Sequence, residues 1–105
     1  MEYKHDKGKL RWDILPINAT EEVVKVLNFG ANKYGPRNWY NVEPIRWFNG
    51  VMRHIAAYMK GEHLDPETGL PHLAHAACSL LFILELTGGY QCPEKNTEKD
   101  IEQKT

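Results

Sequence analysis

The segment PHLAHAACSLLFILELTGG, residues 71–89, decides the fold. Pro71 suits the first turn of a helix, and the pair Gly88-Gly89 is typical of a helix end. Between these limits apolar side chains fill almost every position, so the predicted helix, running to about Thr87, is apolar nearly all round. Such a helix must be buried on several sides. A chain this small offers little surface to bury it, so we predict a dimer or larger oligomer with this helix at the interface.

Two further helices are predicted upstream of this segment. The first begins at Asn18, which can cap it while Glu21 reaches back three residues later, and it ends before Gly35-Pro36. The second begins at Pro44 and ends at Lys60-Gly61. Both carry apolar residues at helical spacing. The sequence therefore predicts a mainly α fold, a three-helix unit that assembles into a helical oligomer.

The two ends of the chain have a different character. Residues 1–17 are expected to form an extended arm with a turn around residues 7–9. Alternation over residues 10–14 is compatible with a short strand, but a lone strand lacks a partner, which favours an ordered loop. Residues 90–105 are polar, of mixed charge and without apolar periodicity, so a mobile tail is predicted. Residues 1–89 are therefore expected to form one helical domain, with residues 37–42 as an internal loop.

Composition and charge narrow the classes of function. The 105 residues include 42% hydrophobic and 26% charged side chains, which is typical of a globular protein. No apolar run reaches the roughly 18 residues of a membrane span, and the polar start is unlike a secretory signal, so we expect a cytoplasmic protein. The net charge of −1 argues against duplex nucleic acid as a partner. Local basic clusters suit a small polyanion better than a polymer. Cys78, in the apolar third helix, is expected to be a buried small hydrophobic residue.

Histidines and acids concentrate between residues 53 and 75. His54 lies late in the second predicted helix, Glu62 and Asp65 lie in the next loop, and His72 and His75 share one face of the third helix. Converging oxygen and imidazole groups can bind a divalent cation. Each residue also has a structural interpretation. Asp65 could cap a helix beginning at Pro66, His75 could be a satisfied core histidine, and Glu22 on the first helix could pair with a lysine instead of binding metal.

Basic and aromatic residues form a second set of candidates. Lys7, Lys9 and Arg11 flank Gly8, where backbone N–H groups can approach a phosphate. Trp39 could stack on a base or equally well pack in the core.

Three ordered motifs resemble one family. The string GKLRWDILP at residues 8–16 is similar to its "GKxRxDLLP" signature, and FGANKYGPRNW at 29–39 is similar to its "FGAxKYxxRNW" segment. The strings RHIAAY at 53–58 and GEHLDPETGLPHLAHA at 61–76 resemble its core, "RHLxAW…GExxDPESGLPHLAHA". This family is the dATP/dGTP diphosphohydrolase domain found largely in phages, related in concept to MazG-like all-α pyrophosphohydrolases. The resemblance covers about residues 4–88.

The resemblance implies a metal-dependent nucleotide-handling enzyme, encoded by a phage and acting in the host cytoplasm, that converts dGTP or dATP to the monophosphate and pyrophosphate. The implied cofactor is Mg²⁺ or Mn²⁺, with another transition metal as an alternative. The expected catalytic residues are His54, Glu62, Asp65, His72 and His75. The expected metal ligands are Glu22, Glu62, Asp65, His72 and His75. The expected residues for the purine nucleotide are Lys7, Lys9, Arg11, Lys33, Tyr34, Arg37, Asn38, Trp39 and Arg53.

One departure keeps alternatives open. MazG-like enzymes carry paired acids as ExxE and ExxD on two helices, whereas this chain has His72 and His75 where an acid pair is expected. Coordination by four carboxylates therefore does not transfer to this sequence. The main rival hypothesis is a non-catalytic phage protein that sequesters a nucleotide signal of host immunity. A divalent-cation requirement distinguishes the two, because a sequestering protein needs no metal.

Overall fold

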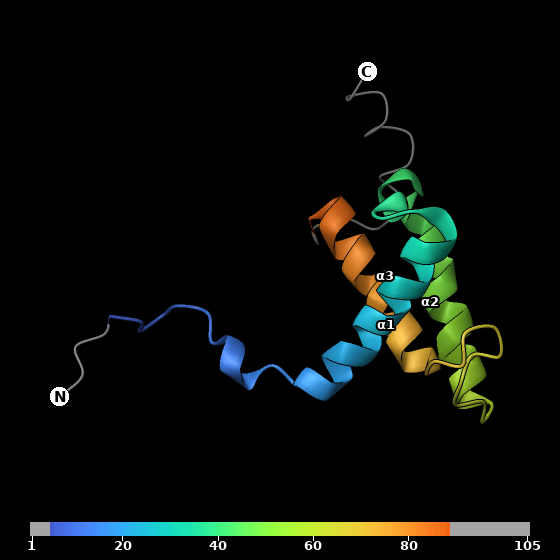
Figure 1. The fold of residues 1–105 in the computed structure, drawn as a ribbon, viewed down its shortest axis with the longest axis horizontal. Helices are drawn as coiled ribbons and strands as arrows, with labels where there is room; N and C mark the ends of the chain where they lie inside the picture. Colours follow the sequence, from blue (N-terminus) through green and yellow to red (C-terminus); the bar gives the residue numbers. More distant parts are fainter. Residues whose placement is uncertain (1–4, 89–105) are drawn as a thin grey trace, which may run out of the picture.

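The computed structural model describes residues 5–88, and Figure 1 shows a mainly helical chain. The described part contains three α-helices, α1 (Ile17–Tyr34), α2 (Pro44–Met59) and α3 (His72–Thr87). Two short 3₁₀ helices, η1 (Trp12–Ile14) and η2 (Asn38–Asn41), precede α1 and α2. The mainly α prediction and all three helices are confirmed, each to within a residue or two of its expected limits. None of these helices is long and apolar enough to cross a membrane.

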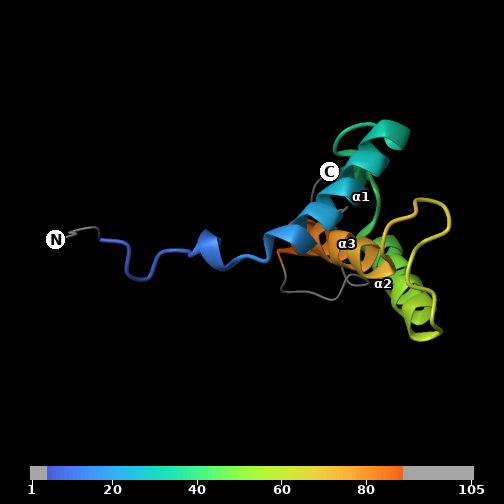
Figure 2. The same ribbon diagram turned by 60° about the horizontal axis from the view of Figure 1, so that its bottom comes forward.

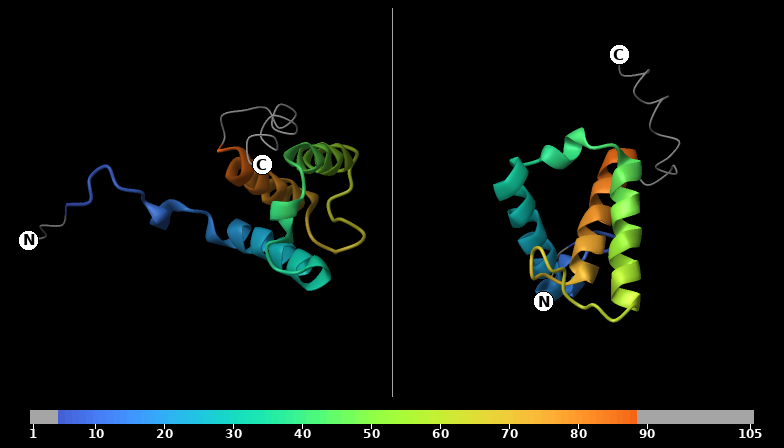
Figure 3. Two further views of the ribbon diagram at one scale, coloured as in Figure 1. Left: turned by 90° about the horizontal axis from the view of Figure 1, so that it is seen from above. Right: turned by 90° about the vertical axis from the view of Figure 1, so that its right-hand side faces the viewer.

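Helices α2 and α3 pack along one another in opposite directions. Trp47 near the start of α2 meets Phe82 near the end of α3, with ring centroids 4.8 Å apart. His54 near the end of α2 meets His72 at the start of α3. The right-hand view of Figure 3 shows this pair side by side, with α1 packed against α3 at its lower end and separate from α2. The antiparallel arrangement brings the end of α2, the next loop and the start of α3 together.

Small side chains on α3 form much of the core. The buried apolar residues are Val51 on α2 and Ala74, Ala76, Cys78 and Phe82 on α3. Alanine and cysteine allow two helix backbones to approach closely, and Cys78 is the most completely buried of them. Burial raises the pKa of its thiol to about 12, as expected for a structural cysteine. The interpretation of Cys78 as a buried small hydrophobe is confirmed.

The expected cap of α1 is wrong by two residues. The helix begins at Ile17, so Asn18 lies inside it, and Pro16 occupies the cap position without a side-chain hydrogen bond. Proline fixes φ near the helical value, here −71°, and has no N–H to leave unpaired, which suits this position. Thr20 closes the first turn instead, because its hydroxyl donates to the Pro16 carbonyl at 2.9 Å.

Residues 5–16 run away from the helices in all views (Figures 1 and 2). The expected turn is present, with the Lys9 N–H donating to the Asp6 carbonyl at 3.0 Å. The short strand considered for residues 10–14 is not adopted. With no partner strand beside it, the segment closes its own hydrogen bond in η1, from the Leu15 N–H to the Trp12 carbonyl. The tail predicted at residues 90–105 lies outside the described residues.

Candidate functional site

The loop between α2 and α3 folds back on itself and so carries its polar residues to the start of α3. An isolated antiparallel bridge joins Leu64 to Pro71. The His72 N–H donates to the His63 carbonyl at 2.9 Å, and the Asp65 N–H donates to the Leu70 carbonyl at 2.8 Å. These contacts satisfy backbone groups at the base of the loop. The bend therefore places loop carboxylates beside histidines of both helices.

Asp65 organises the tip of this loop. Its Oδ1 accepts hydrogen bonds from the N–H groups of Glu67 at 2.8 Å and Thr68 at 3.0 Å. Gly69 completes the turn with a φ of 72°, a left-handed conformation that glycine adopts without steric cost. Asp65 thus caps a turn rather than a helix, because residues 66–69 do not continue into helical conformation. This role uses one carboxylate oxygen and leaves Oδ2 for another partner.

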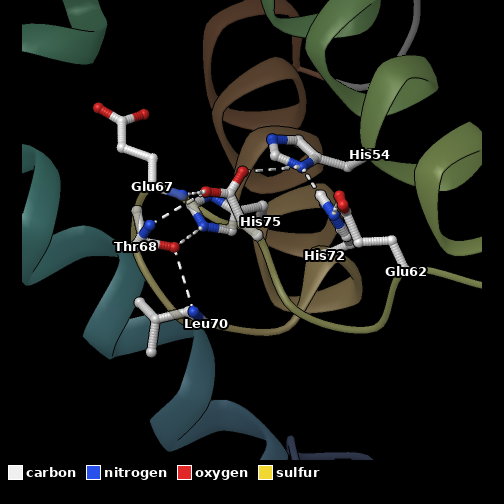
Figure 4. Close-up of polar contacts among 8 residues, drawn as sticks. His54, Glu62, Glu67, Thr68, Leu70, His72 and His75 are labelled. Atoms are coloured by element: carbon white, nitrogen blue, oxygen red, sulfur yellow. Dashed lines mark hydrogen bonds and ion pairs between the residues drawn. The ribbon is translucent and has the colours of Figure 1, made fainter.

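Two histidines from different helices meet beside Asp65 (Figure 4). His54 Nδ1 lies 2.8 Å from His72 Nδ1 and 3.9 Å from Asp65 Oδ2. The opposite nitrogen of His72, Nε2, lies 2.6 Å from Glu62 Oε1. Since an ionised carboxylate only accepts, His72 Nε2 donates this hydrogen bond and its Nδ1 presents a lone pair. His72 is also only 4% exposed, so its ring is firmly held.

His75 lies on the other side of His54. The two rings stack with centroids 4.6 Å apart and planes 12° from parallel. His75 Nε2 is 2.7 Å from the Thr68 hydroxyl, which in turn accepts the Leu70 N–H. This chain of contacts fixes the orientation of the His75 ring against the loop.

Burial and neighbouring groups together lower the pKa values of three residues at the site, His54, His75 and Asp65. Burial lowers the pKa of His54 and of His75, because the charged imidazolium loses hydration, and neighbouring histidines lower both pKa values further. Burial by itself raises the pKa of Asp65, but the N–H groups of Thr68 and Glu67 and the nearby histidines lower it overall. The site therefore favours neutral imidazoles beside an ionised carboxylate, which are the protonation states that bind metal.

Three of these residues are close enough to share one cation. His54, Asp65 and His72 each offer one ligand atom, and these atoms lie within 4.8 Å of one another. For metal–nitrogen bonds of about 2.1 Å, the separation of the two Nδ1 atoms corresponds to an angle of about 85° at the ion. The donor set therefore fits a divalent ion.

The three residues that converge differ from the expected set of metal ligands. His54, expected only as a catalytic group, joins the set, whereas Glu62 contacts the outer nitrogen of His72 and His75 stacks on His54. Glu22 forms an ion pair with Lys25 at 2.5 Å on α1, the lysine pairing considered from sequence.

Comparison with known proteins places the chain. A family profile described as dATP/dGTP diphosphohydrolase, N-terminal, matches residues 2–95. The chain belongs to this family. A dATP/dGTP diphosphohydrolase of Salmonella phage PMBT28 is 42% identical over 83 residues, which are 79% of this chain and 29% of the relative. The chain thus spans less than a third of that relative's length. No solved structure matches the chain.

The expected nucleotide-binding residues lie in separate parts of this chain. Lys33 on α1 forms an ion pair with Glu67 of the loop at 2.6 Å, so it lies beside the histidine cluster. Arg11 pairs instead with Asp13 on the exposed segment before α1. That segment, which also carries Lys7 and Lys9, does not approach the loop within one chain (Figures 1 and 2).

The remaining expected residues lie on or near η2 and on α2. Trp39 stacks on Tyr40 and on Phe82, with centroids 4.1 and 4.7 Å away, so its ring packs against α3. Arg37 is exposed and has a φ of 60°, in the left-handed region. Tyr34 and Arg53 are exposed, and Asn38 is half-buried.

Sequence reasoning missed Thr68 and the carbonyl of His63. Thr68 orients His75, and the His63 carbonyl anchors the first residue of α3. Thr68 stands three residues after Asp65, a spacing at which a turn-capping carboxylate reaches the later N–H. That spacing could have indicated the Asp65 contact, but nothing local predicts the contact with His75.

Proposed function

We propose that this domain binds a purine deoxynucleoside triphosphate with a divalent cation and hydrolyses it to the monophosphate and pyrophosphate. The observation that carries the proposal is the convergence of His54, Asp65 and His72 in a member of this family. The three side chains place one carboxylate oxygen beside two imidazole nitrogens, and these are donor atoms that bind a divalent cation.

The bond changes assign a role to each group. A water oxygen bonds to the α-phosphorus, the bond from that phosphorus to the α–β bridging oxygen breaks, and pyrophosphate leaves with the electron pair. The bound cation supplies charge neutralisation and acidifies water. His54, Asp65 and His72 would hold that cation, and Glu62 would orient His72. His75, with its lowered pKa, would accept the water proton near neutral pH.

The phosphates of the substrate would need cationic partners, and its purine base would need planar partners. Lys33 lies at the loop through its contact with Glu67. Exposed guanidinium groups at Arg37 and Arg53 can donate to phosphate oxygens in pairs. Tyr34 and Asn38 lie in the α1–η2 region and would contact the purine, whereas the Trp39 ring stacks on Tyr40 and Phe82 and would support this region from within the fold.

The basic residues before α1 suggest an assembled enzyme. The segment that carries Lys7, Lys9 and Arg11 runs away from the helices of its own chain, so these residues would serve a site of a neighbouring subunit (Figure 1). A homo-oligomer formed through α3 supplies that neighbour, because leucines on this helix remain 46–55% exposed. Such an enzyme would act in the cytoplasm of an infected host.

The test incubates the chain with each dNTP and with Mg²⁺, Mn²⁺ or Co²⁺, and separates the products by chromatography. We expect dGMP or dAMP together with pyrophosphate. In D65N the amide oxygen still accepts the Glu67 and Thr68 N–H groups while the ligand charge is lost. We expect the rate to fall at least 100-fold with the circular dichroism spectrum unchanged.

H63N is the matched control, since it alters an exposed histidine of the same loop and should retain the wild-type rate. Intact nucleotides under every metal would refute catalysis by this chain.

A further inference from the structure

The contacts of the histidine cluster carry chemical information beyond the presence of a cation. Two of the three converging ligand atoms are imidazole nitrogens, and the third is a single carboxylate oxygen. They come from α2, the loop and the first residue of α3, so three separate elements bring their ligand atoms together. We infer that His54 Nδ1, Asp65 Oδ2 and His72 Nδ1 bind a first-row transition ion in preference to Mg²⁺, with Glu62 as the residue that positions His72.

The ligand types determine the class of ion. Mg²⁺ requires oxygen ligands in near-ideal octahedral geometry and gives up water reluctantly. Imidazole nitrogens instead suit zinc, iron, cobalt and related ions, and two histidines with one carboxylate leave positions open for water or substrate. A site with two histidines and one acid among its ligands therefore discriminates against Mg²⁺ through its donor atoms.

Burial strengthens this discrimination. The His72 side chain is 5% exposed, and those of Asp65 and His54 are 16% and 22% exposed. An ion held here exchanges part of its hydration for protein ligands. That exchange is costly for Mg²⁺ and is offset for a transition ion by its stronger bonds to nitrogen.

Glu62 acts through His72 and not on the ion. Its carboxylate accepts the Nε2 proton at 2.6 Å, which leaves Nδ1 without a proton and directed at His54. A carboxylate behind a metal-bound histidine fixes the tautomer and raises the basicity of the ligand, and its loss weakens metal affinity about 10–100-fold. The same contact holds the ring orientation that makes the two Nδ1 atoms converge.

The inference rests on the proposed function for the purpose of the ion, but its test needs no nucleotide. The full chain is freed of metal by chelation and titrated with Co²⁺, whose visible absorption bands report on ligand type and geometry. We expect one Co²⁺ per chain, displaced by equimolar Zn²⁺ and retained in a hundredfold excess of Mg²⁺. D65N and H54N should each bind Co²⁺ at least tenfold more weakly, and H63N should bind it as the wild type does.

Glu62 is tested by two variants in the same titration. E62Q should weaken Co²⁺ binding about 10–100-fold, and E62D should restore part of the loss because a carboxylate is again present. Equal affinity in E62Q and wild type would remove Glu62 from the site.

Two results separate this inference from the proposed function. Displacement of Co²⁺ by Mg²⁺, or equal Co²⁺ affinity in D65N and H63N, overturns the transition-ion site even if the chain hydrolyses dNTPs. Selective Co²⁺ binding without hydrolysis of any dNTP upholds the site and overturns the proposed catalysis.

Discussion

At the scale of single residues, the burial of His54 and His75 makes the stability of the fold depend on pH. Both are held in their neutral forms, since burial lowers the pKa of each below the ordinary 6.5. Below that pH the unfolded chain therefore binds protons that the folded chain does not. The free energy of unfolding therefore rises with pH through this window, and the contribution of the two histidines is fully present above about pH 6.5.

We predict that the free energy of unfolding of the metal-free protein increases from pH 5 to pH 7. H75Q should flatten this increase, because it removes one of the two histidines whose pKa is lowered in the folded chain. Urea unfolding at several pH values measures the effect. Asp65 titrates at much lower pH, so it does not contribute in this range, and an unchanged slope in H75Q would contradict the account.

Arg37 combines an exposed guanidinium with a backbone that suits glycine. A non-glycine residue in the left-handed region costs about 1 kcal/mol, so R37G relieves strain while it removes the charge. We predict that the free energy of unfolding of R37G lies within about 1 kcal/mol of the wild-type value. Its KM for dNTP should rise about tenfold. Steady-state kinetics and thermal unfolding on the same samples check both parts. An unchanged KM would exclude Arg37 from phosphate binding.

At the scale of elements, the loop after α2 determines the site, and its turn depends on Gly69. An alanine there must adopt a φ of 72°, which is unfavourable for any L side chain with a Cβ, although no atom lies within 4 Å of the added carbon. The penalty comes from the backbone alone. Gly30 inside α1 is the contrasting case, since it has ordinary helical geometry and open space around it.

We predict that G69A lowers the free energy of unfolding by about 1 kcal/mol and G30A raises it by about 0.5–1 kcal/mol. The two variants add the same methyl group, so their opposite signs isolate conformation from hydrophobicity. Chemical denaturation measures both. G69A should also weaken metal binding, because the turn presents Asp65. Equal effects of the two substitutions would show that the described turn is wrong.

At the scale of the whole molecule, large apolar side chains remain exposed to solvent in the isolated chain. On α3, Leu73, Leu80, Leu81 and Leu84 are 46–55% exposed. Before α1, the side chains of Leu10, Trp12 and Ile14 are at least 70% exposed. A stable assembly of copies would bury both surfaces and would bring Lys9 near a neighbouring site.

We predict that the wild type is a dimer or larger in light scattering, and that L80E with L84E produces monomers with unchanged helix content. Burial of each leucine contributes about 1.5–3 kcal/mol, so two charged replacements exceed what a small interface can tolerate. V24E places the same charge on an exposed position of α1 and should leave the assembly intact. A monomeric wild type at micromolar concentration would contradict the prediction.

The sequence by itself determined the three helices, because apolar periodicity and the residues that stop a helix are local features. Gly35-Pro36, Pro44 and Gly88 lie within a residue or two of the observed ends. It also indicated the short region that contains the converging side chains, since His54 to His75 is contiguous in the chain. The family followed from the same ordered motifs.

Only the tertiary structure decided how these residues combine. Antiparallel packing of α2 on α3 sets His54 against His72 across 18 positions of sequence, and the folded-back loop assigns Glu62 to the outer nitrogen of His72. Lys33 reaches Glu67 from a different helix in the same way. Residue spacing shows which side chains share a face of one helix, but the choice of nitrogen and partner depends on how separate elements pack. That packing is fixed by burial over the whole chain, and no single segment encodes it.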